Sequence, residues 1–135
     1  MSNKDLFQRV REMRLPIGKY VLFGSAPMGI RGLKDCHDID VLVTEDLWDE
    51  FAIKSGWVLK VGPSGDEYLW NDEIELWKEW KPGKWNTQKL IDDAEIIDGL
   101  PFVKLEYVVK NKKQDGREKD LKDIEVIEEF LRTQE

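Results

Sequence analysis

The chain has 135 residues, of which 41% are hydrophobic and 36% are charged, so its composition predicts one folded domain over residues 1–135 and excludes disorder and collagen-like repeats. Its 28 acidic and 21 basic residues give a net charge of −7, which argues against duplex nucleic acid as a partner because Lys and Arg must neutralise its phosphates. No apolar run approaches the roughly 18 residues of a membrane span, and the N-terminus lacks the apolar segment of a secretory signal. A single cysteine, Cys36, cannot form an internal disulfide, so we expect a cytoplasmic protein without membrane association.

Apolar spacing and turn residues predict alternating helices and strands. Gly24 and Ser25 end an apolar strand, and Pro27 suits the first turn of a helix. Thr44 can cap a helix that ends at Gly56. Such a mixture, with one hairpin region, indicates an α/β (α+β) fold with a mixed β-sheet flanked by helices. The expected elements are helices at 4–14, 45–56 and near 87–93, strands at 20–23, 38–43, 57–61, 67–70, 73–77 and 94–97, a helix starting at 98–101 with Phe102, Leu105, Val108 and Val109 on one side, a polar loop at 111–116, and a last helix with Leu121, Ile124, Ile127 and Leu131 on its apolar side.

The most informative segment, Tyr20–Val43, combines a glycine turn with two acids on a strand. Gly24 has no Cβ, so a ligand can lie against its backbone, and the Ser25 hydroxyl and the following amides can meet a phosphate. Asp38 and Asp40 are two residues apart, so both side chains project from one face of the expected strand. Acids on an apolar strand are costly unless a cation pairs with them, and carboxylate oxygens favour Mg²⁺ or Mn²⁺.

A third acid strengthens the prediction of a metal site. Glu75 lies between Ile74 and Leu76 on an expected strand, which marks it as an acid inserted among apolar residues. Glu73 is two residues earlier on the same expected face and is the alternative. Three carboxylates can hold two metal ions about 3.5–4 Å apart, an arrangement suited to in-line displacement at phosphorus.

Other polar and aromatic residues have simpler interpretations. Trp80 and Trp85 flank a loop near the third acid, where they could stack on a base or an acceptor ring, or pack against the sheet. His37 is the only histidine, so a zinc site lacks ligands and a solvent-facing side chain is favoured.

The Gly24–Ser25 turn, the twelve residues that follow it, the Asp38–Asp40 strand and the later Glu75 resemble the signature of the nucleotidyltransferase superfamily related to DNA polymerase β. The resemblance implies the nucleotidyltransferase fold and Mg²⁺-dependent transfer of a nucleoside monophosphate from an NTP, such as ATP, to an acceptor hydroxyl, with release of pyrophosphate. It assigns Asp38, Asp40 and Glu75 to metal binding and catalysis. Gly24 and Ser25 would cradle the triphosphate.

The end of the chain resembles the lincosamide-type and abortive-infection-type branches, and the core motif is also similar to that of minimal nucleotidyltransferases. Lys104 matches a lysine on a helix behind the sheet, and Arg117–Asp120 matches a basic turn with a Lys-Asp helix start. The resemblance makes Lys104 a contact to the nucleotide phosphates, whereas its place on an apolar helix face is equally explained by a stem lying along that surface.

The acceptor is open at this stage: a small molecule, a protein side chain or an RNA end would each fit. The alternative to an enzyme is a catalytically degenerate nucleotidyltransferase-fold module that binds a partner protein, as an antitoxin-like regulator does.

Overall fold

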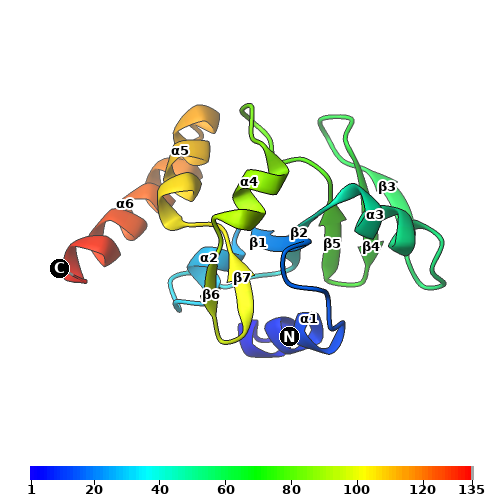
Figure 1. Cartoon of the computed structure of the whole chain (residues 1–135). Helices are drawn as coiled ribbons and strands as arrows, with labels where there is room; N and C mark the ends of the chain where they lie inside the picture. Colours follow the sequence, from blue (N-terminus) through cyan, green and yellow to red (C-terminus); the bar gives the residue numbers. More distant parts are fainter. Residues whose placement is uncertain (135) are drawn as a thin grey trace.

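The computed structural model describes residues 1–134, which form six helices around one mixed sheet of seven strands in the order β3-β4-β5-β2-β1-β7-β6 (Figure 1). Glu135, the last residue of the expected domain, lies outside the described residues. The strands are β1 (Tyr20–Phe23), β2 (Ile39–Val43), β3 (Val58–Val61), β4 (Glu67–Asn71), β5 (Ile74–Trp77), β6 (Glu95–Ile97) and β7 (Leu100–Phe102), and the helices are α1 (Asn3–Glu12), α2 (Ala26–Gly29), α3 (Glu45–Ala52), α4 (Thr87–Asp92), α5 (Leu105–Asp115) and α6 (Glu118–Thr133).

The sheet is mixed, as the sequence predicts. The pairs β2–β5 and β1–β7 are parallel, whereas β1–β2, β3–β4, β4–β5 and β6–β7 are antiparallel. Strands β1 and β2 are therefore central, and the turn after β1 lies beside the start of β2. This places the Gly24–Ser25 turn next to the acids of β2.

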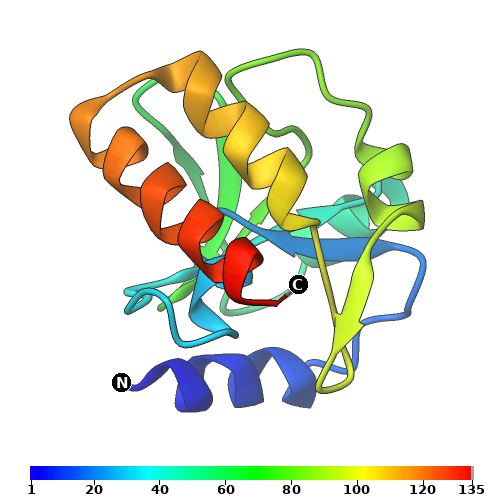
Figure 2. The same cartoon turned by 90° about the vertical axis from the view of Figure 1, so that its left-hand side faces the viewer.

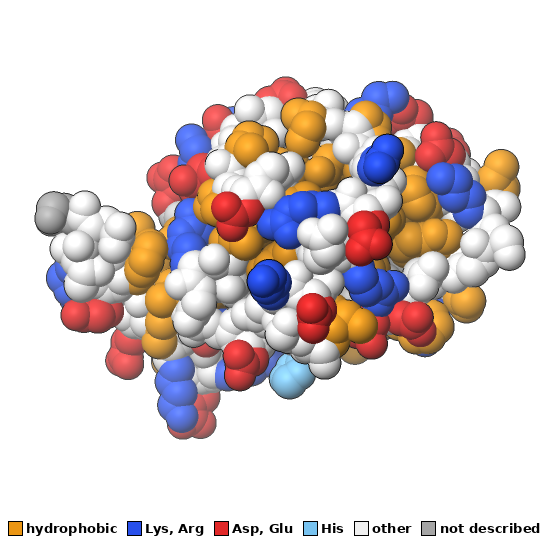
Figure 3. Space-filling view, turned by 90° about the horizontal axis from the view of Figure 1, so that it is seen from below, with side chains coloured by type: hydrophobic (Ala, Val, Ile, Leu, Met, Phe, Trp, Pro, Cys, Tyr) orange, Lys and Arg blue, Asp and Glu red, His pale blue; other side chains and the backbone are white. Residues whose placement is uncertain are grey.

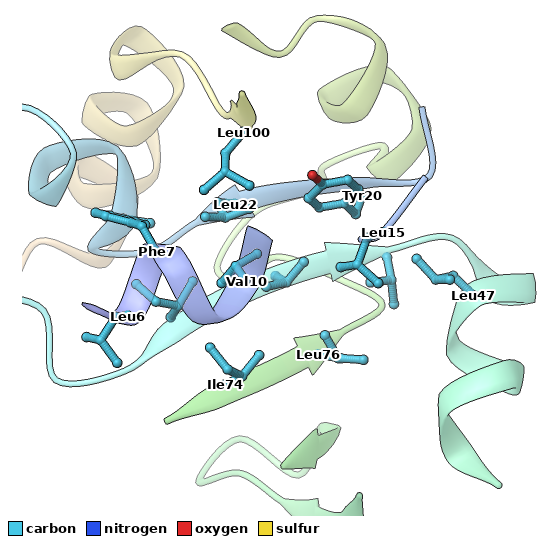
Figure 4. Close-up of a cluster of buried hydrophobic side chains, with 14 of the residues drawn as sticks. Leu6, Phe7, Val10, Leu15, Tyr20, Leu22, Leu47, Ile74, Leu76 and Leu100 are labelled. Carbon is cyan, nitrogen blue, oxygen red and sulfur yellow. The ribbon is translucent and has the colours of Figure 1, made fainter. Parts of the chain in front are cut away.

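Helix α1 covers one face of the sheet. Ser2 caps it: the Ser2 hydroxyl accepts a hydrogen bond from the Asp5 amide at 3.1 Å, and the Asp5 carboxylate accepts one from the Ser2 amide. Leu6, Phe7 and Val10 of α1 are buried against apolar side chains of β1, β5 and β7 (Figure 4). The first core cluster therefore forms between α1, α3 and this face.

The opposite face carries a second core cluster beneath α4, α5 and α6. Successive residues of β1 alternate between the two clusters, so that Tyr20 and Leu22 join the first and Val21 and Phe23 join the second. Helices α5 and α6 lie side by side over this face, with α1 on the other side of the sheet (Figure 2). The centre of the sheet is thus buried on both faces, whereas the edge strand β3 is exposed.

The prediction of a helix starting at 98–101 is wrong, because Leu100–Phe102 forms strand β7. Asp98 and Gly99 both have positive φ, 50° and 80°, which suits the two-residue turn of a β-hairpin joining β6 to β7. The polar loop predicted at 111–116 is also wrong. Helix α5 continues to Asp115 and ends at Gly116, which takes the left-handed conformation that commonly terminates helices.

The apolar side predicted for the last helix is correct only in its middle. Ile124 and Ile127 are buried, whereas Leu121 and Leu131 are 54% and 42% exposed. The third buried residue of α6 is an acid, Asp120, which is 1% exposed. Within residues 1–134, no helix has the length and apolarity to cross a bilayer.

We expect Leu22→Ala to lower the free energy of unfolding by about 2–5 kcal/mol, because a buried leucine truncated to alanine loses apolar contacts and leaves a cavity. Leu22 is fully buried in β1, whereas Leu59 of β3 is 55% exposed, so Leu59→Ala should change the stability by about 0.5 kcal/mol or less. Urea denaturation measures both. Equal losses in the two variants would contradict the assignment of Leu22 to the packed core.

Candidate functional site

Strand pairing brings two of the predicted acids together. Asp40 of β2 is paired in parallel register with Glu75 of β5, and with Phe23 of β1 on its other side. Residues paired across neighbouring strands project from the same face of the sheet. Asp38 directly precedes β2, two residues from Asp40. The three predicted acids therefore cluster where β2 and β5 begin.

The pKa values of the three acids are raised by burial and, for Asp40 and Glu75, by neighbouring carboxyls. Burial raises the pKa of Asp40 well above its ordinary value, and the nearby Asp38 and Glu75 carboxyls raise it further. Burial is also the main cause of the raised pKa of Glu75 and of Asp38. Because Asp40 and Glu75 are paired across β2 and β5, the two carboxyls titrate as an interacting pair.

Gly24 allows this cluster to lie against the backbone of the first turn. Its φ is +65°, and a Cβ built on it would lie 2.5 Å from Asp40 Oδ2. No side chain fits there without moving the Asp40 carboxylate. The glycine is thus required both by the backbone conformation and by the close approach of an acid.

A cavity of about 380 Å³ opens beside the turn and the acids. Gly24, Ser25, Asp38 and Asp40 line it, so the structure brings four of the predicted site residues together. Glu75 is not a lining residue and reaches the cavity through its contact with Asp40. Charged and aromatic side chains complete the lining. They come from the loop between β3 and β4, from β5 and the loop that follows it, and from α5, α6 and the turn between them, and they include Asp66, Trp77, Trp80, Lys81, Lys112, Arg117 and Lys119.

The structure does not bring Lys104 to this cavity. Lys104 precedes the first residue of α5, and its ammonium lies 3.9 Å from a carboxylate oxygen of Asp93. It lines a different hollow, with Arg31 and Glu95. Lys104 lies outside the cavity because residues 100–102 form β7, so that α5 begins only at Leu105.

Basic side chains from other elements line the cavity instead. Lys34 contacts Asp123 at 2.7 Å, and Lys112 lies 3.0 Å from the same carboxylate and 3.6 Å from Asp120. Arg117 contacts Asp120 through its Nε at 2.8 Å. The cavity thus has an acidic wall from the sheet and, held by α5 and α6, a wall that we name the basic wall, where the four basic side chains Lys34, Lys112, Arg117 and Lys119 lie among the acids Asp115, Asp120 and Asp123.

Asp120 and Asp123 hold basic side chains of this wall, a role that the sequence did not predict for them. Asp120 is almost fully buried, and its pKa is lowered by hydrogen bonds from Arg117 and by the charge of Lys112, against the opposing effect of burial. The sequence does contain a signal for this role, because Asp120 shares the helix face of Ile124 and Ile127. An acid at a core position predicts a buried partner.

The alternative third acid, Glu73, points elsewhere. Its carboxylate forms a salt bridge with Arg9 of α1, on the side of the sheet that α1 covers. Glu73 precedes β5, which begins at Ile74, so the two-residue spacing to Glu75 does not place Glu73 on the same face.

The surface of the molecule seen from below carries basic and acidic side chains interspersed with one another (Figure 3).

Trp80 and Trp85 pack in the second core. Trp80 is 6% exposed and stacks on Trp85 with ring centroids 4.7 Å apart. Trp80 also makes a T-shaped contact with Phe23. This favours packing over base stacking for the pair. His37 is exposed, as expected.

The donor set suits a divalent cation by its chemistry, since three carboxylates offer the hard oxygens that Mg²⁺ and Mn²⁺ prefer. Within residues 1–134, however, no group of three or more acidic, histidine or cysteine side chains surrounds a common point. Asp40 and Glu75 instead lie side by side as an in-register pair. A cation bound in the cluster would favour the charged carboxylates and so oppose the burial and the like charges that raise their pKa values.

Comparisons of the chain with protein-family models, curated proteins and solved structures give no match. The family resemblance of the sequence therefore stays a prediction, and the functional argument depends on the geometry of the site.

We expect Gly24→Ala to cost more stability than Gly32→Ala. Both glycines have positive φ, +65° and +72°, but a Cβ at Gly32 meets nothing within 4 Å. Gly32→Ala should therefore cost only the backbone penalty, about 1–2 kcal/mol. In an Asp40→Ala background, the cost of Gly24→Ala should fall toward that of Gly32→Ala, as measured by urea denaturation. Strict additivity of Gly24→Ala and Asp40→Ala would contradict the close approach.

We expect Asp40→Asn to stabilise the metal-free protein increasingly as the pH rises above about 4. The folded pKa of Asp40 is raised, so its contribution to stability is fully present below the unfolded pKa, about 3.9, and is lost as the pH rises through the folded pKa. Asparagine cannot ionise and still offers an oxygen to the indole of Trp77 and an amide to Glu75. Thermal unfolding in chelator at several pH values measures the difference. Asp49→Asn, at an exposed position of α3, is the control, and a pH-independent effect of Asp40→Asn would contradict the shift.

Proposed function

We propose that this chain is a divalent-metal-dependent nucleotidyltransferase with the nucleotidyltransferase fold, which transfers a nucleoside monophosphate from an NTP to an acceptor hydroxyl and releases pyrophosphate. The observation that carries the proposal is the in-register pairing of Asp40 with Glu75 beside Asp38 and the Gly24–Ser25 turn, at one wall of a cavity whose other wall is basic. Sequence motif and spatial arrangement thus agree on the same residues.

In this proposal, the acidic wall holds the cation and receives a proton. Asp38 and Asp40 bind Mg²⁺ or Mn²⁺, and Glu75 completes the site from the neighbouring strand. When bound, such a cation neutralises charge on phosphate oxygens and lowers the pKa of the attacking hydroxyl. The acceptor oxygen forms a bond to the α-phosphorus, the bond from that phosphorus to the bridging oxygen breaks, and pyrophosphate leaves with the electron pair. The hydroxyl proton passes to the carboxylate cluster.

The basic wall suits the triphosphate. Lys112 and Arg117 face the cavity with their charges already oriented by Asp120 and Asp123. Positioning and charge neutralisation supply most of the catalysis in transfer at phosphorus, so a sparse set of oriented groups can suffice. In our proposal, these two residues take the phosphate-binding role that the resemblance gives to Lys104, while Gly24 and Ser25 border the same space.

One observation favours the alternative, a binding module of the same fold without catalysis. The three acids do not surround a common point within residues 1–134, and the cations of the basic wall named above already have carboxylate partners. Such a module would use the surface for a partner protein. Binding of NTP with Mg²⁺ separates the two functions.

The test is incubation of the protein with each α-labelled NTP and Mg²⁺, against a panel of small molecules, proteins and RNA ends. We expect label transfer and pyrophosphate release that stop when a chelator is added. Asp40→Asn and Glu75→Gln should each reduce turnover by roughly 10²–10³-fold, the loss typical of removing a group that stabilises developing charge. Glu73→Gln is the matched control, because Glu73 binds Arg9 instead, and it should leave turnover within about twofold of the wild type.

Calorimetric titration with NTP and Mg²⁺ measures nucleotide binding, and the turnover of the two glutamate variants identifies the third acid. If the wild-type protein binds no nucleotide in the presence of metal, the enzyme proposal is wrong. If Glu73→Gln abolishes turnover and Glu75→Gln does not, the assignment of the third acid is wrong.

A further inference from the structure

Trp77 contacts the acid cluster directly. The indole Nε1–H donates a hydrogen bond to Asp40 Oδ1 over 3.2 Å. Trp77 pairs with Leu42 in the parallel register of β2 and β5, two residues beyond the Asp40–Glu75 pair. The indole therefore reaches back along the same face of the sheet to the acid.

This hydrogen bond distinguishes the two oxygens of Asp40. Oδ1 accepts from the indole, whereas Oδ2 is the atom that lies against Gly24. An indole N–H can only donate a hydrogen bond, so the Trp77 indole favours the carboxylate orientation that directs a lone pair of Oδ1 toward it. Rotation of the carboxylate away from this position would break the hydrogen bond. The contact thus fixes the orientation of Asp40 at the cavity wall.

The indole itself is packed on two sides. Its ring stacks on Tyr68 of β4, with centroids 4.5 Å apart and planes 18° from parallel. At its far edge the ring lies close to Gly62, whose lack of a side chain leaves room for it, since a Cβ there would lie 3.3 Å from the Trp77 ring. A donor held in this way can orient a carboxylate at little entropic cost, because few rotamers are lost when the bond forms.

We propose that Trp77 is a positioning residue, whose indole N–H holds the Asp40 carboxylate in the orientation used to bind the divalent cation. The metal-binding half of this inference rests on the proposed function, whereas the orientation of Asp40 does not. Groups that orient metal ligands from behind typically change metal affinity 10–100-fold when removed. Trp77→Phe removes the donor and keeps an aromatic ring for Tyr68.

The first measurement needs no metal. In protein labelled with ¹⁵N at its tryptophan indoles, Trp77→Phe assigns the Nε1–H resonance of Trp77 by its loss. The hydrogen bond to a carboxylate should hold this proton downfield, and Asp40→Ala should move it upfield while Trp77 and its ring stacking remain in place. A Trp77 resonance that does not respond to Asp40→Ala would overturn the proposal.

The second measurement is Mn²⁺ binding by calorimetry. Trp77→Phe should weaken binding about tenfold. Trp57→Phe is the matched control: Trp57 packs edge-on against Phe51 in the first core cluster, on the opposite face of the sheet, and this variant should bind Mn²⁺ like the wild type. Equal affinities of Trp77→Phe and Trp57→Phe would overturn the positioning role. If the wild type binds no Mn²⁺ although its Trp77 resonance depends on Asp40, the proposed function fails and the orientation of Asp40 by Trp77 stands.

Discussion

The parallel pairing of β2 with β5 is the constraint on which the site depends, because it sets two carboxylates side by side in a partly buried position. Asp40 and Glu75 face each other across this pair, and Asp38 adds a third charge. Like charges at this separation are unfavourable, and burial adds to the cost. The surroundings accommodate them with the indole of Trp77 and with the missing side chain of Gly24. A structure without a use for these acids gains nothing from the arrangement, which is why the cluster supports a functional interpretation.

The net charge of −7 conceals a local division of charge across the cavity. Acids of the sheet form one wall, and basic residues oriented by buried or half-buried acids of α6 form the other. Asp120 and Asp123 thus contribute negative charge to the total while positioning Lys112, Arg117 and Lys34. Bulk charge argues against a general affinity for phosphate backbones, but it could not indicate that one cavity combines both signs. That division depends on which side chains meet in the folded chain.

The sequence predicted the first half of the fold and the acidic wall because their signals are local. The period of two between Asp38 and Asp40 and the break at Gly24 act within a few residues of the chain. The region after residue 97 was misread because Phe102, Leu105 and Val108 happen to follow helical spacing. The two-residue Asp98–Gly99 turn between β6 and β7 contradicts a helix there, and it was the stronger signal. The burial of Asp120 could be inferred from its helix face, and Arg117 is a local partner three residues before it. Its other partner, Lys112, could not be inferred, since it reaches Asp120 through the packing of α5 against α6.

The same region contains Lys104, which the resemblance assigned to the nucleotide phosphates and which the structure places outside the cavity. Lys104 and Lys112 are eight residues apart, which is about two helical turns and a rise of roughly 12 Å along α5. With the helix starting at Leu105 and continuing through the polar stretch to Asp115, the second lysine reaches the cavity and the first stays outside it beside Asp93. Residues 111–116 look like a loop by composition, yet they must be helical for Lys112 to lie between Asp120 and Asp123. The basic wall of the cavity therefore depends on a helical segment whose stability comes from packing against α6 rather than from its own sequence.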